Sequence, residues 1–547
     1  METRKSFLKV FFTFVFIIFP WVLGTIYYIR YQREETSLMS EHKVKVENYE
    51  KPDTIAKVDH TKFPILQQDF KSPQEVTLAC LSCHNKTDHD FMQTTHWKWA
   101  RKSVNNQGDT IMFGKKDAIN NFCIGLSSNE PRCTSCHAGY GWKNKSFDFS
   151  KHENIDCIVC HDQTGTYKKF PTKAGLPVNK ETVFGKKTFF PPDYNNIAQH
   201  VGSPKRENCG ACHFFGGGGN NIKHGDLSKA LTKTTKKVDV HMGIDGGDMS
   251  CVECHKTEHH KITGQLYSVS SENKERVTCT QCHTEKPHKT EKLNLHSNKV
   301  ACQTCHIPEY AKVEPTKLYW DWSKAGKHNP DGSVMIKKDS AGNMIYHTFK
   351  GSFKWGKHLK PEYVWFNGTA KHYHLGDKVD TDKVVKLNTL LGSYNDSTAK
   401  IIPVKIHRGR QIYDKKNLML INPHLFGKDS TAYWKNFDWN KAAEAGMKYV
   451  NLPYSGDYGF IETEMYWPVN HMVSESSQAL SCKECHAPEG RLSNLTDFYL
   501  VGRDANKTLD WIGIILIIGS VIGVFIHATL RIINSKSRRA KKAKSLK

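Results

Sequence analysis

Two strongly apolar runs lie near the ends of the chain, and the long stretch between them is polar by comparison. The first run covers residues 7–28 and the second covers residues 509–530. Each is about 20 residues long, which as a helix is enough to cross a hydrocarbon layer of roughly 30 Å. The pattern predicts two transmembrane helices. A cleaved signal peptide is the alternative for the first run, although no clear small-residue cleavage site follows it.

Basic residues flank each apolar run on its outer side. Arg4 and Lys5 precede the first run, and the tail at 531–547 is rich in lysine and arginine. Because such residues stay in the cytoplasm, residues 1–6 and the tail are predicted to be cytoplasmic. The stretch between the runs then lies in the periplasm, and the protein is anchored at both ends in the cytoplasmic (inner) membrane.

The pattern Cys-x-x-Cys-His occurs eight times and uses all but one of the 17 cysteines. Two thiols three residues apart reach the two vinyl groups on one edge of a porphyrin, and the following imidazole lies below the iron as its proximal ligand. Chance would give about 0.03 such motifs in a chain of this composition. Motifs 1 to 8, in chain order, are Cys80, Cys83 and His84; Cys133, Cys136 and His137; Cys157, Cys160 and His161; Cys209, Cys212 and His213; Cys251, Cys254 and His255; Cys279, Cys282 and His283; Cys302, Cys305 and His306; and Cys482, Cys485 and His486.

Other uses of paired cysteines do not fit this pattern. A zinc or redox site would explain one motif but not eight. A disulfide framework would keep neither the spacing nor the histidine that follows it. The motifs therefore predict eight covalently bound haem c groups.

Composition agrees with a chain that packs around porphyrins. Hydrophobic residues make up only 38% of the chain and the mean hydropathy is −0.57, and the two end runs raise both values. Aromatic residues are plentiful, which argues against disorder. We therefore expect a mainly α, multihaem cytochrome c fold, with short helices and long loops around a haem cluster, little β-sheet, and the two transmembrane helices.

The spacing of the motifs divides the exported stretch into parts. Seven motifs lie between Cys80 and His306, and the eighth follows a long segment without cysteine. That segment is rich in tryptophan, and we expect its rings to pack on porphyrin faces and to fill the core. The predicted order is a stalk at 29–62, a seven-haem region at 63–310, an aromatic-rich region at 311–470 and an eighth-haem region at 471–508.

The formal net charge of +23 has two interpretations. A basic chain rich in aromatic residues is typical of nucleic-acid binding. Eight haems, however, bring about sixteen propionate charges, partly offset by the irons, and the excess of lysine balances them. We therefore expect no nucleic-acid partner.

Histidines outside the motifs are candidate second axial ligands. An iron with two imidazoles passes electrons and binds nothing else, whereas catalysis needs an open or displaceable position. Because no motif replaces its histidine with lysine, the proximal residues do not single out a catalytic haem. His60 lies on the stalk and is given no role. The candidates near the motifs are His89, His96, His152, His200, His224, His241, His259, His260, His288, His296 and His471.

Segments between the motifs carry a more specific signal than the motifs themselves. They are 121–125 (NFCIG), 130–142 (EPRCTSCHAGYGW), 156–162 (DCIVCHD), 164–168 (TGTYK), 208–219 (NCGACHFFGGGG), 223–226 (KHGD), 239–242 (DVHM), 302–308 (CQTCHIP) and 320–323 (WDWS). Together these segments resemble the octahaem tetrathionate reductase family of multihaem c-type cytochromes.

The resemblance implies an oxidoreductase that reduces small sulfur or nitrogen compounds: tetrathionate, nitrite and hydroxylamine. It also implies one haem with a lysine amine as axial ligand and seven haems with two histidines. Lys223 stands at the matching position, just after the four-glycine run, and is expected to be catalytic. An amine binds iron only when neutral, and burial beside a metal favours that form. The alternative is an ordinary surface lysine in a loop.

Cys123 is the one cysteine outside the motifs, and it lies within a family-like segment. We expect it either to line the substrate cavity as a catalytic thiol or to be a small buried hydrophobic residue. The chain departs from the family pattern at Asn220, where relatives are expected to have an acid. It departs again in its membrane anchors, because relatives are soluble after export.

Three functions remain open from the sequence. The first is a reductase that receives electrons from a quinol-linked or cytochrome donor and acts on a small sulfur or nitrogen oxyanion. The second is an electron-transfer conduit without its own substrate, which two tight ligands on every iron would impose. The third is hydroxylamine oxidation, which would require a tyrosine cross-linked to a haem.

Overall fold

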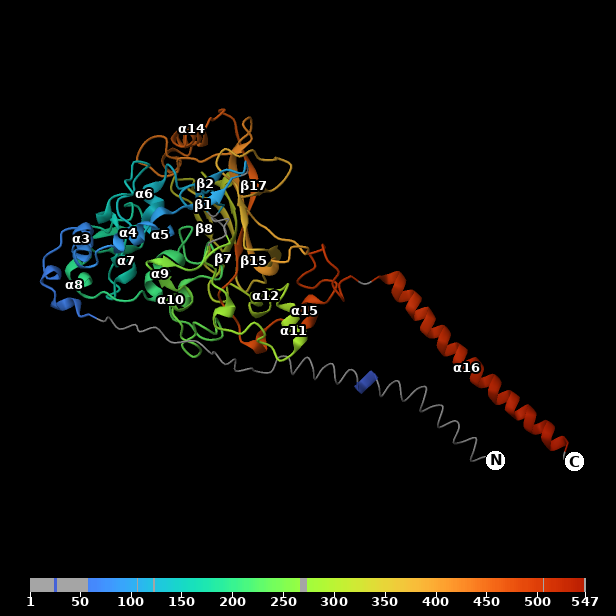
Figure 1. Ribbon diagram of the computed structural model, residues 1–547. Coiled ribbons are helices and arrows are strands. Elements are labelled where there is room, and N and C mark those ends of the chain that lie inside the picture. Colours follow the sequence, from blue (N-terminus) through green and yellow to red (C-terminus); the bar gives the residue numbers. More distant parts are fainter. Residues whose placement is uncertain are drawn as a thin grey trace. The chain divides into compact units, whose positions relative to one another are not determined.

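The computed structural model describes residues 24–26, 58–105, 107–121, 123–265, 273–504 and 506–545. They belong to two compact units, Met1–Leu480 and Ser481–Lys547. The first unit combines many short helices with a large β-sheet (Figure 1). The second contains one motif-bearing turn and a long helix.

Short helices joined by long loops carry most of the haem motifs. The longest of those described in this region, α3, has 11 residues. It begins where the Ser72 side chain accepts the N–H of Glu75 and proline occupies the first position, both common helix starts. The helices are α3 (Pro73–Cys83), α4 (Thr87–Met92), α5 (Thr95–Lys98), α6 (Glu130–Cys133), α7 (Ile158–His161), α8 (Tyr194–Gln199), α9 (Arg206–His213), α10 (Cys251–Cys254), α11 (Glu291–His296) and α12 (Cys302–His306).

A mixed nine-stranded sheet occupies the aromatic-rich region. Its order is β13-β17-β15-β7-β10-β9-β8, with β11 and β16 also paired to β15. The pairs β15–β7 and β13–β17 are parallel and the others are antiparallel. The strands are β7 (Thr316–Asp321), β8 (Ile336–Lys338), β9 (Met344–His347), β10 (Gly351–Gly356), β11 (Glu362–Phe366), β13 (Val385–Lys386), β15 (Lys400–Asp414), β16 (Met419–Leu420) and β17 (Tyr458–Pro468).

Four two-stranded ribbons complete the strands that the structure describes. They are β1 (Arg101–Val104) with β2 (Thr110–Phe113), β3 (Thr182–Phe184) with β4 (Lys187–Phe189), β5 (Thr257–Glu258) with β6 (Lys261–Ile262), and β12 (Ala370–His372) with β14 (Asn388–Leu390).

The prediction of a mainly α fold with little β-sheet was wrong. The chain has 29% helix and 19% strand, and the nine-stranded sheet is its largest element. The central strand β15 is buried along almost its whole length, so it lacks the polar–apolar alternation that marks a strand in a sequence. Pro403 within it also argued against a central strand. The aromatic and β-branched residues that favour strands had been assigned to porphyrin contacts.

The aromatic side chains of this region fill the core beside the sheet. Trp320, Trp322 and Trp467 are each at most 1% exposed, and the rings of the first two stack with centroids 4.9 Å apart. They share one hydrophobic cluster with Met447 of α14 (Trp439–Tyr449). A second short helix, α13 (Tyr433–Asn436), precedes α14. The expectation that these rings fill the core therefore holds.

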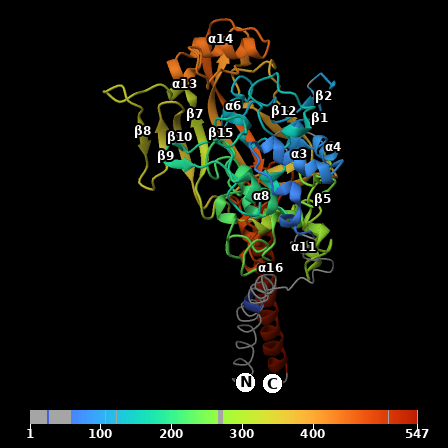
Figure 2. The same ribbon diagram turned by 90° about the vertical axis from the view of Figure 1, so that its left-hand side faces the viewer.

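The helical and sheet parts of the first unit form two layers. Figures 1 and 2 show α3 to α9 gathered on one face of the sheet built from β7, β15 and β17. In both views α14 lies at one end of that sheet. The layer of short helices contains motifs 1 to 4, so the sheet provides a rigid wall behind them.

The second unit contains α15 (Cys482–Cys485) and α16 (Lys507–Lys544). Within α16, Lys507–Ala540 is long and apolar enough to cross a membrane, with a peak mean hydropathy of 2.4. Two such helices were predicted, but one is found in the part of the chain that the structure describes. The predicted span at 7–28 lies outside the described residues except for 24–26.

Gly446 tests the packing of α14 on the sheet layer. A Cβ at this position would overlap the backbone carbonyl of Asn422 and lie 2.7 Å from the backbone nitrogen of His424. Gly446→Ala should therefore destabilise the fold by about 1–3 kcal/mol, although alanine favours a helix. Thermal unfolding followed by circular dichroism measures the effect. The exposed Lys448→Ala on the same helix should leave the midpoint nearly unchanged, and equal midpoints for both variants would contradict this packing.

Candidate haem centres

Each motif forms a single helical turn that places its histidine beneath the cysteine pair. The backbone N–H of His84 bonds to the carbonyl of Cys80 at 2.9 Å and that of His486 to the carbonyl of Cys482 at 2.8 Å, whereas the N–H of His137 in motif 2 bonds to the Thr134 carbonyl at 2.9 Å. Serine caps two of these turns: Ser250 and Ser481 each begin a capping box with a glutamate three residues later. The short turn brings both thiols and the imidazole to one side of the backbone, as attachment to a porphyrin edge requires.

Backbone carbonyls orient several motif imidazoles. The Nδ1 atom of His161 lies 2.9 Å from the carbonyl oxygen of Gly202, and that of His255 lies 2.8 Å from the carbonyl of Thr263. A ring that donates through Nδ1 presents its other nitrogen, Nε2, as a lone pair for a metal. Burial lowers the pKa of His213 to about 3 and that of His306 to about 4, so both are neutral at pH 7, as ligands must be.

Six motif imidazoles face a second imidazole from elsewhere in the first unit. A metal–imidazole bond is about 2 Å long and the ring centre lies about 1 Å beyond the nitrogen, so two imidazoles on one iron have centres about 6 Å apart. The six ring pairs match this spacing. They are His84–His60 at 6.3 Å, His161–His260 at 6.5 Å, His213–His96 at 6.1 Å, His255–His471 at 6.4 Å, His283–His241 at 6.0 Å and His306–His288 at 6.2 Å.

The cysteines of different motifs also come close together. Thiols lie within hydrogen-bonding distance in four places: Cys80 with Cys157, Cys136 with Cys212, Cys209 with Cys251, and Cys279 with Cys302. Porphyrins attached at these motifs would be close to one another, which would favour electron transfer between them. Together with the ring spacing, this arrangement shows that the residues present fit haem.

Eight motif cysteines are not members of these four thiol pairs. They are Cys83, Cys133, Cys160, Cys254, Cys282, Cys305, Cys482 and Cys485. Three of the four pairs join the first cysteines of two motifs, which explains why most of the remaining cysteines are second ones. The two cysteines of a motif reach different vinyl groups, so one of them can meet a neighbouring motif while the other does not.

Cys282 and Cys305, the second cysteines of motifs 6 and 7, therefore differ from the cysteines that precede them. Both were predicted to bind haem. The thiol contact between motifs 6 and 7 is made by the first cysteine of each motif, Cys279 and Cys302. The Cys282 thiol is instead close enough to Cys254 of motif 5 for their charges to interact. The backbone carbonyl of Cys305 accepts the N–H of Leu480 at 3.0 Å. Haem attachment at Cys282 and Cys305 stays a prediction from their spacing.

Motif 2 differs from the other motifs of the first unit. His137 is 1% exposed, and its Nε2 donates a hydrogen bond to the carbonyl oxygen of Trp97 at 2.7 Å. Its ring lies among five aromatic side chains, and no second imidazole faces it among the described residues. The nitrogen that would bind an iron is therefore occupied, unlike that of His161 or His255.

Lys223 lies beside motif 2. Its ammonium group is 4.8 Å from the ring centroid of Trp467, and its charge interacts with the Cys136 thiol. Burial lowers the pKa of Lys223 to about 7. The side chain also explains the first glycine of the run, because a Cβ at Gly216 would lie 2.9 Å from its Cδ atom. The alternative of a surface lysine in a loop does not fit this environment.

The segment that carries Lys223 is held by a buried lysine, Lys405. The Nζ atom of Lys405 donates to the carbonyls of Ile222 at 2.8 Å and Lys223 at 3.0 Å, and to the Thr316 hydroxyl at 2.6 Å. Lys405 comes from the central strand β15 and is 1% exposed. The sheet thus fixes the backbone from which the Lys223 side chain extends. No sequence pattern indicated this contact.

Cys123 lies on the other side of motif 2. Its thiol is close enough to Cys133 for their charges to interact, and its side chain packs against the cluster that contains Trp320. Its backbone N–H donates to the Asn120 side chain at 2.8 Å. The structure therefore brings both predicted catalytic residues to one motif, with Cys123 beside its first cysteine and Lys223 beside its second.

Six of the predicted distal histidines are not found in the ring pairs. Three of them bond to nearby acidic or backbone groups: His152 to Asp88 at 2.5 Å, His200 to the Asn196 carbonyl at 2.8 Å and His296 to the Lys292 carbonyl at 2.7 Å. The other three are His89, which lies against the His152 ring, His224, which lies against Trp467, and His259, which contacts Asp90.

His60 is the residue that the sequence analysis missed. It belongs to the segment assigned as a stalk, yet its ring stacks on that of His84 with an angle of 19° between the planes. Its Nδ1 lies 3.2 Å from the carbonyl of Val58. Its proximity in sequence to motif 1 was the available signal.

Comparisons with known proteins relate the chain to c-type cytochromes. Residues 79–162 match the family described as cytochrome c554 and c-prime, and residues 317–489 match the family described as bacterial cytochrome c. An uncharacterised protein of Archaeoglobus fulgidus is 22% identical over 241 residues, which cover 38% of this chain and 80% of that protein.

A solved structure gives a stronger match. The crystal structure of octahaem cytochrome c from Shewanella oneidensis is 45% identical and has a TM-score of 0.72. The match covers 80% of this chain and 96% of that one. An identity this high over nearly the whole of the relative extends beyond the motifs to the segments between them. The chain therefore belongs to the octahaem tetrathionate reductase family of multihaem c-type cytochromes, which carry covalently bound haem c.

Proposed function

We propose that this protein is a membrane-anchored octahaem reductase that faces the periplasm and reduces tetrathionate, nitrite or hydroxylamine at motif 2. The observation that carries the proposal is the environment of that motif. Its histidine is bonded to a carbonyl through Nε2, while Lys223 and Cys123 flank its two cysteines. A haem at motif 2 would keep one axial position available, which every fully imidazole-ligated haem lacks.

Eight haem c groups, one at each motif, are the proposed cofactors. When bound, their irons accept and release single electrons. Motif 2 would use Lys223 as an axial ligand, and the six paired motifs would each use two histidines. The proposed second ligands are His60, His260, His96, His471, His241 and His288, for motifs 1, 3, 4, 5, 6 and 7 in that order.

Lys223 and its surroundings suit a neutral amine. Burial favours the uncharged form, and the Lys405 contacts hold the backbone on which the side chain depends. Lys115, whose ammonium lies 3.7 Å from the Trp99 ring centroid, interacts with Lys223 and disfavours a second charge there. The Lys115 ammonium would also attract anionic substrates to motif 2.

The membrane and the electron donor complete the proposal. The apolar part of α16 ends in a basic tail, which supports a cytoplasmic location for the tail and a periplasmic location for the haem-bearing residues. That compartment is where haem is attached to c-type cytochromes. A quinol-linked or cytochrome donor in or near the membrane would supply electrons, which would then pass along the closely spaced motifs.

A turnover assay on the purified holoprotein tests the reductase function. A reduced dye donates electrons, and its oxidation is followed separately with tetrathionate, nitrite and hydroxylamine. The proposal requires turnover with at least one of them. Oxidation of the dye with none of the three, despite fast reduction of all haems, would instead support an electron conduit.

Lys223→Ala tests the proposed ligand. We expect the variant to retain eight haems, to change the absorption spectrum of one haem and to lose roughly 100-fold in turnover, a typical cost of losing a metal-site residue. Lys233→Ala, an exposed lysine ten residues later, is the control and should match the wild type. An unchanged spectrum in Lys223→Ala would exclude this residue as a ligand.

Acidification should release the Lys223 amine. Protons compete with iron for the amine lone pair, and the pKa of this lysine without iron is about 7. Because iron binding favours the neutral form, the midpoint should lie at or below about pH 7, and ligation is lost as the pH falls. Absorbance of the ferric protein between about pH 8 and pH 5 follows the change. The same transition in Lys223→Ala would refute the assignment.

Cys123→Ser distinguishes sulfur from nitrogen substrates. If the thiol exchanges with a sulfur chain, tetrathionate turnover should fall about tenfold, equivalent to about 1.4 kcal/mol, while nitrite turnover stays near the wild-type value. Steady-state rates with both substrates on the same preparation give the ratio. Equal losses for both would show that Cys123 is only a packing residue.

A further inference from the structure

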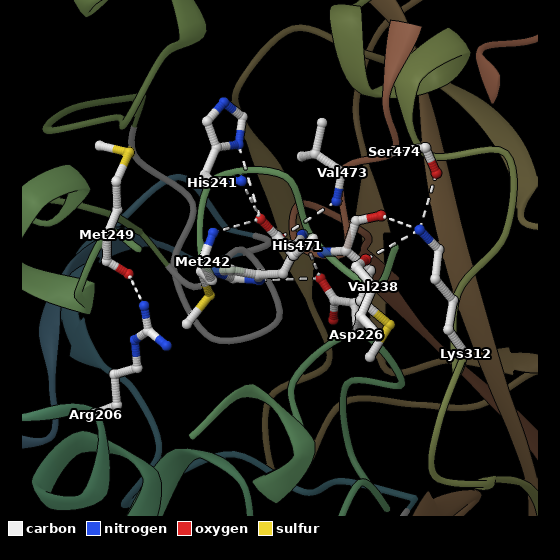
Figure 3. A network of polar contacts seen from close by, with 12 residues as sticks. Arg206, Asp226, Val238, His241, Met242, Met249, Lys312, His471, Val473 and Ser474 are labelled. Carbon is white, nitrogen blue, oxygen red and sulfur yellow. Dashed lines mark hydrogen bonds and ion pairs between the residues drawn. The ribbon is translucent and has the colours of Figure 1, made fainter. Parts of the chain in front are cut away.

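Two buried carboxylates join the loops that carry His471 and His241. Asp226 and Asp239 are 1% and 2% exposed, and both bond to the segment around His471 (Figure 3). His471 faces the motif 5 histidine and His241 faces the motif 6 histidine. The thiols of motifs 5 and 6 are also close enough for their charges to interact. The two carboxylates therefore lie between the second ligands of two neighbouring haem sites.

Asp226 bonds directly to the imidazole of His471. Its Oδ2 atom accepts from the backbone N–H of Asn470 at 2.8 Å and of His471 at 3.0 Å, and it lies 3.1 Å from His471 Nδ1. This single oxygen fixes both the backbone and the ring of His471. The Nδ1–H is donated to the carboxylate, so Nε2 is the nitrogen that faces His255.

Asp239 bonds to backbone groups of both loops. Its Oδ1 accepts from the N–H of His241 at 2.9 Å and of Met242 at 3.0 Å, while its Oδ2 accepts from Met472 at 2.8 Å and Val473 at 3.3 Å. The His241 Nδ1 lies 3.8 Å from Oδ1, beyond hydrogen-bonding distance. Asp239 thus positions His241 through its backbone, whereas Asp226 also bonds to the ring of its histidine.

The backbone that follows His471 is strained and held in place by the same network. Met472 has a φ of +67°, in the left-handed region that non-glycine residues rarely adopt. The Nζ atom of Lys312 donates to the Met472 carbonyl at 2.8 Å, to the Val238 carbonyl at 3.0 Å and to the Ser474 hydroxyl at 2.8 Å. Lys312 and Asp239 therefore keep the His471 loop in one conformation, and the charge of the half-buried Lys312 interacts with that of Asp239.

A carboxylate on Nδ1–H changes the electronic properties of a metal-bound imidazole. It draws the ring proton towards itself, increases the electron density on the ring and makes it a stronger ligand for ferric iron. A stronger ligand for the oxidised state lowers the reduction potential. His471 has such a partner within hydrogen-bonding distance and His241 does not, so the second histidines of two neighbouring sites differ in this contact.

We propose that Asp226 is a positioning residue that sets the reduction potential of the haem held by His255 and His471 below that of the haem held by His283 and His241. An electron shared by the two sites would then reside mainly at motif 6. The proposal depends on the histidine pairing but not on the reductase activity, so a protein that reduces none of the three substrates could still satisfy it.

The test is a spectroelectrochemical titration of the Asp226→Asn holoprotein. The amide preserves the shape of the side chain but removes the charged acceptor of the His471 proton. We expect the spin states of the haems to match those of the wild type and one component to have its one-electron reduction favoured about tenfold more, a shift of about 59 mV. Unchanged midpoint potentials would overturn the proposal, as would a new high-spin haem, because Asp226 would then only hold the ligand in place.

Two further variants separate the hydrogen bond from simple charge. Asp239→Asn removes a carboxylate of similar burial that bonds to no imidazole, and it should shift any component less than Asp226→Asn does. An equal shift would show that loss of the carboxylate charge alone changes the reduction potential, and it would overturn the proposal. Asp226→Glu keeps the charge but displaces the acceptor. If the Asp226→Asn protein does not fold, Asp226→Glu should still raise the reduction potential of one haem. An unchanged potential in Asp226→Glu would contradict the proposal.

Discussion

The spacing of about 6 Å between paired imidazole rings is the constraint on which the first unit depends. In six places two rings leave room for one metal atom, with centroids 6.0 to 6.5 Å apart. The partners are often far apart in sequence, as His255 and His471 are. A metal bond between such segments acts as a cross-link and ties binding energy to folding energy. This explains how short helices and long loops can hold fixed positions.

The haem sites could largely be predicted from the sequence because their chemistry is local. The spacing Cys-x-x-Cys-His is set by one porphyrin edge, and Lys223 and Cys123 were found through the segments around them. Ligand pairing could not be predicted, since it depends on which distant loop reaches each iron; His60 was overlooked for this reason. The sheet was missed because β15 is buried throughout and contains Pro403, which hides the alternation of a strand.

Among the described residues, motif 2 lacks the second imidazole that lies near the histidine of every other motif in the first unit. Its histidine donates Nε2–H to a carbonyl within an aromatic box, and a lysine held by strand β15 lies beside it. A sheet that seemed unnecessary for binding haem therefore has a function here, because it rigidly supports the backbone of the proposed lysine ligand. Motifs 5 and 6 differ from motif 2, because buried carboxylates bond to their second histidines and hold them in place.

The ring planes allow a direct test of the central claim that each imidazole pair holds one iron. Three pairs are nearly parallel, at 19°, 26° and 13°, and three are nearly perpendicular, at 78°, 68° and 67°. Parallel rings separate the energies of the two iron d orbitals of π symmetry, whereas perpendicular rings leave them nearly equal. The electron paramagnetic resonance spectrum of the ferric holoprotein should therefore contain two classes of low-spin signal, one of them much more anisotropic. A single class, or no low-spin signal, would contradict the account.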